Sequence, residues 1–556
     1  MPFDAISYAL AKRALRRALT PRLSDLVVDV DKDWAKKNIV NFGPNGIDLH
    51  GMVTSHANRH VKGGADEVLN LANINDAVGF SLEAHASRHA VGGADEIPDN
   101  ALNRAKISDF FNSPFWDNIP DKPNTFPTSL AISGLASSFE NESDVDGLAK
   151  MVELLNEIDL LATIFNHTNL SADKAASIFR SDNISLSRIY DILSSNIITG
   201  DRVQSILYSW VESLDKISKL IDLLTITGSD VILSSNATYT GFNVFSSLDL
   251  NGYTYTADGQ PHVIVAKTIN IPSASSIIKT PTGGLGGQDA YGSKSGGNGG
   301  GGLIIIANTI NIYGSISANA ENGVDHTSAP GSGAGEDGGS GLRIILSEDL
   351  YNVYGGDGGD IGGVYCSGGG GGAPNGDGGS GGNGGYNGGN GGPITTITFD
   401  TAKDMLKEVL KYIVDLWIQN VLGKSLTSPK VMDIKGAGGG SGGSTSSISH
   451  GGGGGGQGGE VIIFAFNLDF TGSISARGGD GGNGWDRGTD YSGGGGSGAG
   501  GLIYLLYVNS VNLTGSFNVS RGALGCGTIS GSTTNCPYPG LYGTYGKART
   551  IHVSIT

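Results

Sequence analysis

The chain has 556 residues and a formal net charge of −17, with 53 Asp and Glu against 36 Lys and Arg. This balance argues against nucleic-acid binding, which needs a concentrated basic surface. Glycine fills 93 positions and charged residues make up only 16%, so much of the chain departs from ordinary globular composition. No apolar run reaches the roughly 18 residues that predict a membrane-spanning helix.

The N-terminal segment DAISYALAKRALRRAL, residues 4–19, places alanines and leucines at helical spacing beside four basic residues, and Arg22 follows it. This pattern predicts a basic helix. Its charged face is either simply solvated or a docking surface for an acidic partner or a lipid surface.

Two copies of H-x-x-R-H-x-x-G-G-x-D-E-[VI] follow, 29 residues apart. The glycine pair permits a tight turn, and the Asp after it can cap that turn. The motifs also hold four histidines: His56, His60, His85 and His89. Around a threefold axis these imidazoles would supply a closed structural metal site. The alternative is a structural turn in which His and Arg bind the backbone and the Asp.

A proline-rich stretch comes next, and its four prolines favour extended segments and turns over helix. The histidine repeat followed by FWDNIPDKPNTFP, residues 115–127, resembles the shaft segments of tail-fibre and receptor-binding proteins of bacterial and archaeal viruses. DWAKKNIVNFG at residues 33–43 is similar to the particle-proximal region of such fibres. The resemblance covers about residues 30–130.

This resemblance implies a homotrimeric, non-enzymatic attachment protein on the virion surface. Residues 1–50 would bind other virion proteins, residues 51–130 would form a shaft, and the C-terminal part would face a host glycan or protein. Beyond the metal ion considered at the histidine repeats, it implies no cofactor.

Apolar residues recur at i, i+3 and i+4 between about residues 140 and 226, which predicts a series of helices. The expected N-caps are Ser171, Ser185 or Ser187, and Thr199 or Asp201. We expect residues 131–228 to form a helical bundle or a stack of hairpins acting as a collar. A trimeric coiled coil fits less well because the heptads break. Trp210 is expected in the helical core.

Residues 229–556 read as strands separated by glycine-dominated windows. Five runs rich in β-branched residues can be superimposed, and they start at Val263, Leu303, Leu342, Val461 and Leu502. The starts are 40, 39, 119 and 41 residues apart, which indicates an internal repeat. Gly314, Gly472 and Gly515 fall at one point of three runs and predict a bend or bulge there. A helix is expected as an insertion at about 400–424, packed on the sheet or a neighbouring subunit.

Most glycines lie in five windows: 283–302, 331–341, 355–392, 436–459 and 478–501. They are disordered linkers, or a calcium-binding repeat of which GGDGGD at 355–360 is the start, or extended three-residue helices that pack through backbone hydrogen bonds. We favour the third interpretation because the windows interrupt a repeat. It resembles the polyglycine sandwiches at the tips of some phage adhesins.

Aromatic residues at the window edges are candidate receptor-binding groups or else packing anchors: Tyr291, Tyr365, Tyr386, Trp485 and Tyr491. Cys526 and Cys536 are candidates for a disulfide, which would leave Cys366 free. Acids on the predicted strands are scarce. Asp469 aligns with Asn311 and Asn509 of other repeats, and Glu460 stands alone.

The sequence therefore predicts a mixed, mainly β, fibrous multidomain chain with a short shaft, an α-helical collar and a Gly-rich β-solenoid or β-sandwich tip. The expected function is that of a tail fibre or spike that attaches a virion to its host. Two alternatives are a cellular surface-layer or biofilm adhesin and a glycan-degrading viral fibre that uses paired carboxylates.

Overall fold

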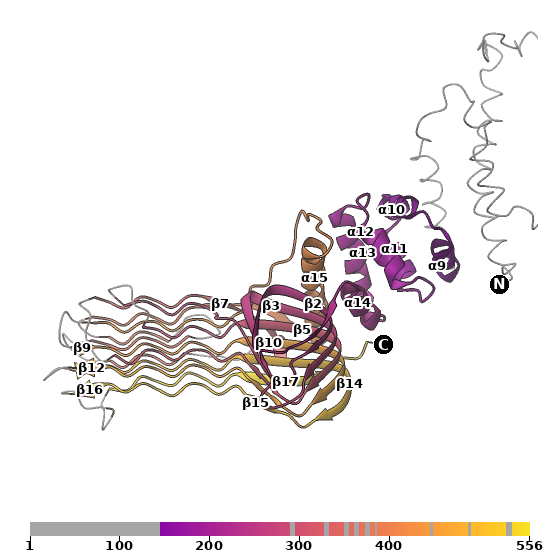
Figure 1. Ribbon diagram of the computed structural model, residues 1–556. Helices are drawn as coiled ribbons and strands as arrows, with labels where there is room; N and C mark the ends of the chain where they lie inside the picture. Colours follow the sequence, from indigo (N-terminus) through magenta and orange to yellow (C-terminus); the bar gives the residue numbers. More distant parts are fainter. Residues whose placement is uncertain are drawn as a thin grey trace, which may run out of the picture. The chain divides into compact units, whose positions relative to one another are not determined.

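The computed structural model describes residues 145–289, 295–326, 333–349, 355–360, 366–372, 379–383, 386–444, 449–486, 491–529, 536 and 538–555. The chain divides into compact units of residues 1–138 and 139–556, and every described residue belongs to the second. In this unit, helices lead into a curved parallel sheet, and glycine-rich segments extend side by side from the sheet (Figure 1).

Six helices of the described region precede the sheet: α9 (Val145–Leu154), α10 (Ile158–Asn166), α11 (Ala172–Arg180), α12 (Leu186–Ser194), α13 (Gly200–Ser213) and α14 (Ile217–Leu224). Three predicted N-caps are confirmed, because Ser171, Ser185 and Thr199 each accept a hydrogen bond from the N–H three residues later. Trp210 lies in the core and is 1% exposed, as predicted.

Eleven strands form one sheet in which every pairing is parallel. They are β1 (Ser229–Ile232), β2 (Ala237–Asp249), β3 (Thr254–Ile271), β4 (Ile277–Lys279), β5 (Gly302–Ile312), β6 (Ser315–Ser317), β10 (Glu460–Phe470), β11 (Ser473–Ser475), β14 (Leu502–Leu513), β15 (Ser516–Asn518) and β17 (Lys547–His552). The order is β15-β11-β6-β4-β3-β5-β10-β14-β17, with β2 and then β1 attached at β3. This sheet curves into a nearly closed barrel.

This architecture corrects the expected fold class. The fibrous chain with an α-helical collar and a β-solenoid or β-sandwich tip is wrong, because the described helices and the parallel barrel form one mixed α/β unit. Helix α14 packs directly on β3 and β5, so the described helices are continuous with the barrel unit. Helical periodicity shows that a face is buried, but it does not identify what covers that face.

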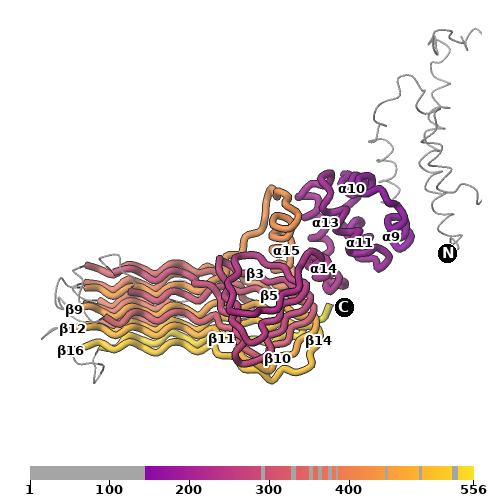
Figure 2. Tube along the Cα trace, in the orientation of Figure 1, coloured from indigo at the N-terminus to yellow at the C-terminus, as the bar shows by residue number. Residues whose placement is uncertain are grey.

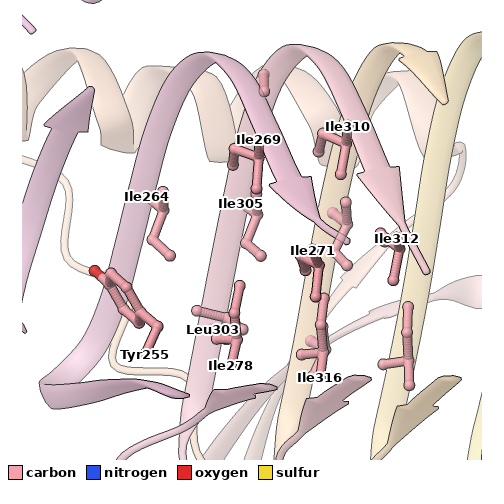
Figure 3. Close-up of a cluster of buried hydrophobic side chains, with 14 of the residues drawn as sticks. Tyr255, Ile264, Ile269, Ile271, Ile278, Leu303, Ile305, Ile310, Ile312 and Ile316 are labelled. Atoms are coloured by element: carbon pink, nitrogen blue, oxygen red, sulfur yellow. The ribbon is translucent and has the colours of Figure 1, made fainter. Parts of the chain in front are cut away.

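The superimposed runs pair with one another inside the barrel wall. Ile264 lies opposite Ile305, Ile305 opposite Ile463, and Ile463 opposite Leu505. All four side chains are buried in the apolar core, where alternate residues of each strand meet. Figure 3 shows Ile264 and Ile305 in this core. The internal repeat therefore identifies which strands pair, while the register of two pairings is shifted by one residue from the aligned starts, because Val263 lies opposite Ile304 and Val461 opposite Ile503.

The recurring glycine of each run is a bend, as predicted. Strands β5, β10 and β14 end just before Gly314, Gly472 and Gly515, and the short strands β6, β11 and β15 begin just after them. A Cβ on Gly314 would lie 2.3 Å from the carbonyl oxygen of Ser276, so the chain can approach its neighbour here only without a side chain.

The run at Leu342 was expected as a further repeat of the series, and this prediction is wrong. Leu342 belongs to β7 (Gly341–Leu346), which pairs in parallel with β8 (Ile394–Phe399) as a separate sheet. The apolar run arises because β7 is buried against β10, where the Ile344 N–H donates to the Glu460 carboxylate. After β7 comes η2 (Ser347–Asp349), where the buried Asp349 carboxylate pairs with Arg549 of β17 at 2.6 Å.

The predicted insertion is α15 (Ala402–Asn420), which packs on α13, β7 and β8. Its buried Asp415 carboxylate ties three parts of the chain together. It accepts hydrogen bonds from the Tyr208 hydroxyl at 2.7 Å, the Gln204 amide at 2.9 Å and the Lys430 N–H at 2.6 Å. The insertion is thereby fixed to the helical region of its own chain.

Candidate functional site

The glycine-rich segments form an ordered array, and segment 436–444 shows how it is built. Its N–H groups donate to segments 295–300, 333–339 and 366–372, and its carbonyls accept from segments 283–287, 386–392 and 451–457. The same neighbour returns every third residue, because Gly436 donates to Gly300 and Gly439 donates to Gly297. A period of three is that of an extended polyproline-II-type helix.

Glycine is required because the backbones touch. A Cβ on Gly439 would lie 2.2 Å from the Gly454 carbonyl oxygen, and one on Gly440 would lie 2.1 Å from that of Gly389. Non-bonded carbon and oxygen atoms do not approach so closely, so these positions admit no other residue without displacing a neighbour. The described windows are thus laterally packed helices, as the favoured interpretation predicts, and not disordered linkers.

Asn and Asp side chains at every third position close an edge of the array. Acceptor oxygens of Asn319, Asn322 and Asp325 bind the N–H groups of Arg477, Asp480 and Asn483 at 2.8, 2.9 and 2.6 Å. The series continues one layer further, where Asp480 and Asn483 accept from Ala523 and Cys526. Each side chain satisfies a backbone donor at the array surface that would otherwise lack a protein acceptor.

The acids of the calcium hypothesis belong to the same pattern. Asp357 and Asp360 accept hydrogen bonds from the N–H groups of Ser380 and Asn383 at 2.5 and 2.6 Å. Within the described residues, no group of three or more His, Cys, Asp or Glu is placed to hold a metal ion. The repeat histidines His56, His60, His85 and His89 lie outside the described residues.

The distal end of the array, farthest from the barrel, is the candidate functional site (Figure 1). Short strands lie there in antiparallel pairs: β9 (Ser449–His450) with β12 (Trp485–Asp486), and β13 (Tyr491–Ser492) with β16 (Thr528–Ile529). Single bridges join Cys366 to both Tyr386 and Ser492. Tyr386, Trp485 and Tyr491, predicted as receptor-binding residues, are thereby gathered at this end and are partly exposed. Tyr291 and Tyr365 lie outside the described residues.

A stacked histidine pair includes His450, which lies opposite Trp485 in the β9–β12 pair. The rings of His326 and His450 have centroids 3.5 Å apart, and the Ser295 hydroxyl lies 2.8 Å from Nε2 of His326. Burial lowers the pKa of both imidazoles, to about 3 for His326, while the Asp289 carboxylate 3.9 Å from His450 acts in the opposite direction. Both rings are therefore neutral at neutral pH. The sequence held no spacing or motif that could have found this pair.

The cysteines are placed as predicted. Cys526 and Cys536 form a disulfide with a Cα–Cα distance of 4.7 Å. Cys366 is free and buried, and its thiol donates to the Ser449 carbonyl at 3.1 Å. The disulfide closes a loop beside β16, so it holds the chain where it returns into the array.

The strand acids do not form a reactive pair. Glu460 is 2% exposed, and burial raises its pKa to about 8 although the Ile344 N–H and Arg343 oppose this shift. Asp469 accepts hydrogen bonds from the Tyr313 hydroxyl at 2.7 Å and from the Asn512 amide at 3.1 Å. Asp469 does lie opposite Asn311, as its alignment suggested, whereas Asn509 lies opposite Asn467.

Comparison with known proteins gives no matching family model, no matching curated protein and no matching solved structure. The described helices include none that is both long and apolar enough to cross a membrane.

Proposed function

We propose that this protein is a non-enzymatic attachment protein of a virus particle, and that its glycine array presents the distal end to a glycan or protein on the host surface. One observation carries the proposal. Three partly exposed aromatic residues, Tyr386, Trp485 and Tyr491, are gathered at the end of a projecting, densely hydrogen-bonded scaffold (Figure 1). Aromatic side chains of this kind dominate recognition surfaces.

The order of the scaffold supports this function, because fixing glycine backbones costs conformational entropy. Fixing one backbone costs roughly 1–2 kcal/mol, and each net hydrogen bond returns about 0.5–1.5 kcal/mol. A flexible linker could connect two sites without this ordering cost. The array does hold its terminal residues in one geometry before a ligand arrives, which lowers the entropy lost on binding.

The proposal includes an anchor and a multivalent assembly. The resemblance to viral fibres carries both: residues 1–50 would bind other virion proteins, and the chain would assemble as a homotrimer. Three copies of a weak site held on one particle would raise the apparent affinity without any new contact. A mass of three chains for the purified protein supports this part of the proposal, and a monomeric mass contradicts it.

Competition with virus tests the attachment function. The purified full-length chain, added to host cells before the virus, should reduce particle adsorption in a saturable manner. Replacing Tyr386, Trp485 and Tyr491 together by Ala should weaken competition by about tenfold or more, because truncated aromatic contacts commonly cost above 1.4 kcal/mol. The matched control is Tyr253→Ala, since Tyr253 is 37% exposed on the barrel unit. Undiminished adsorption at saturating wild-type protein would refute the proposal.

A further inference from the structure

A second exposed aromatic surface lies on the flank of the array, on segment 538–546 at the C-terminal edge (yellow in Figure 2). The segment reads YPGLYGTYG, with glycine at every third position. These glycines face inward, since a Cβ on Gly540 would lie 2.1 Å from the Gly495 carbonyl oxygen. The residues between them face outward, and Leu541, Tyr542 and Tyr545 are 56%, 51% and 59% exposed.

A cation is held against this surface. The Arg521 guanidinium lies 4.0 Å from the ring centroid of Tyr542 and 5.0 Å from that of Tyr545. One of its N–H groups donates to the Gly543 carbonyl at 3.3 Å, which fixes its position. Arg477 of the neighbouring layer pairs with Asp480, whereas Arg521 forms no ion pair with a carboxylate of the described residues. Among the described residues the positive charge of Arg521 therefore faces two tyrosine rings and a carbonyl, and no carboxylate neutralises it.

The surface is a linear track. Extended three-residue helices rise about 3.1 Å per residue, so Tyr542 and Tyr545 follow one another at roughly 9 Å on the same side. At the other end of the segment, the Tyr538 ring packs edge-on against Tyr491 with centroids 5.6 Å apart. Aromatic groups therefore continue from the flank to the distal end, which suits an extended polymer better than a compact ligand.

Four main-chain N–H groups of the segment are already bonded within the array. The N–H groups of Gly540, Leu541 and Gly546 donate to carbonyls inside the array, and that of Gly543 donates to the Ser497 hydroxyl at 2.9 Å. An added peptide strand needs such donors for its own backbone. The segment offers side chains instead: flat rings, on which the apolar faces of sugar rings pack, and a guanidinium, whose fork matches a carboxylate.

We propose that Tyr542, Tyr545 and Arg521 form a binding track for an acidic polysaccharide, a linear glycan whose sugar rings bear carboxylates. The net charge of −17 repels polyanions at long range, so binding depends on these close contacts. The track residues Tyr542, Tyr545 and Arg521 differ from the proposed host-attachment residues, although Tyr538 contacts Tyr491 between the two regions, and either proposal can fail without the other.

Titration calorimetry of the full-length chain with tetragalacturonate tests the track, with the methyl-esterified tetramer as a neutral matched ligand. We expect saturable binding of the acid form. Arg521→Gln should weaken the acid form by about tenfold and leave the ester form little changed. Tyr542→Ala and Tyr545→Ala should weaken both forms by about tenfold, because both forms need the rings.

The controls separate loss of binding from loss of structure. Tyr542→Phe keeps the ring and should bind like the wild type, and Tyr253→Ala removes an exposed ring elsewhere and should do the same. Trp485→Ala at the distal end should leave tetragalacturonate binding unchanged while it weakens cell attachment. Absence of saturable binding by the folded wild type would overturn the proposal, as would an Arg521→Gln variant that loses the ester form as much as the acid.

Discussion

The glycine array makes a sharp prediction at Gly440, in its central segment. In Gly440→Ala the new methyl would start 2.1 Å from the Gly389 carbonyl oxygen, so the neighbouring segment must retreat by about 0.9 Å to reach even a 3.0 Å contact. Retreat stretches two hydrogen bonds of Gly389, from its N–H to Ser441 at 2.8 Å and from the Gly370 N–H to its carbonyl at 2.9 Å.

The expected cost follows from these contacts. Two backbone hydrogen bonds contribute about 1–3 kcal/mol, and overpacking a close-packed interior adds about 1–3 kcal/mol. The reduced freedom of alanine in the unfolded chain offsets roughly 0.5–1 kcal/mol. We therefore expect Gly440→Ala to lower the free energy of unfolding by about 2–5 kcal/mol.

Urea unfolding with hydrogen exchange resolved along the chain measures this effect. Amides of segments 366–372, 386–392 and 436–444 should lose protection together, while those of β5 and β10 in the barrel keep theirs. Ser380→Ala is the matched control, because Ser380 is an exposed residue of the array and its substitution leaves the backbone bond to Asp357 intact. A Gly440→Ala chain with wild-type stability and protection would refute the packing argument.

Four further predictions follow from single contacts. Asp325→Ala should cost about 1 kcal/mol in urea unfolding by leaving the Asn483 N–H without its acceptor, and Asp325→Asn, which keeps an acceptor oxygen, should restore stability. Glu460 holds its proton in the folded chain up to about pH 8, so its contribution to stability is full below about pH 4.5 and is lost as the pH rises to about 8. Glu460→Gln should therefore remove roughly 3–5 kcal/mol of the pH dependence of the unfolding free energy, measured from pH 5 to 8. His326 acts in the opposite direction, because its lowered pKa gives stability above about pH 6.5 that is lost as the pH falls toward about 3, and His326→Gln should flatten this dependence in unfolding measured from pH 3 to 7. Replacing Cys526 and Cys536 by Ser should cost about 2–3 kcal/mol for a loop with a sequence separation of 10, seen as a lower melting temperature, and an unchanged melting temperature would show that the loop is constrained without the disulfide.

The features that could be predicted from the sequence are those that depend on one residue type at one position, or on a short local pattern of residues. The period of about 40 residues identified which strands pair but not their exact register, because the aligned starts put Val263 beside Leu303 whereas Val263 lies opposite Ile304. The bend glycines and the three helix N-caps were likewise readable, since each depends on one residue type at one position. The disulfide was predictable from two cysteines beside a short loop.

The remaining features depend on contacts with segments that are distant in the sequence, and no local pattern identifies those segments. The fold class was predicted wrongly because an amphipathic segment does not specify which element packs on its apolar face. The packing of α14 on β3 and β5 has no sequence signature. The run at Leu342 matched the repeat only because it is equally buried. In the array, backbone atoms make the contacts, so composition could predict that glycine segments pack laterally but not that segment 436–444 has six neighbours. Tyr542, Tyr545 and Arg521 were missed because their exposure depends on segment 538–546 lying at the edge.

The edge residues explain how a glycine lattice can end inside a single folded chain. A backbone array has no intrinsic boundary, because each outer segment offers donors and acceptors that another glycine segment could join, much as an open sheet edge does. At one described edge, Asn319, Asn322 and Asp325 use side-chain oxygens to bind the next layer's donors, and at the C-terminal edge Leu541 and Tyr542 put bulky groups where a further backbone would lie. Positions that end the lattice are also the ones where side chains are permitted. The lateral surface that prevents further association is therefore a surface on which recognition chemistry can be placed, and the proposed track of Tyr542, Tyr545 and Arg521 lies on it.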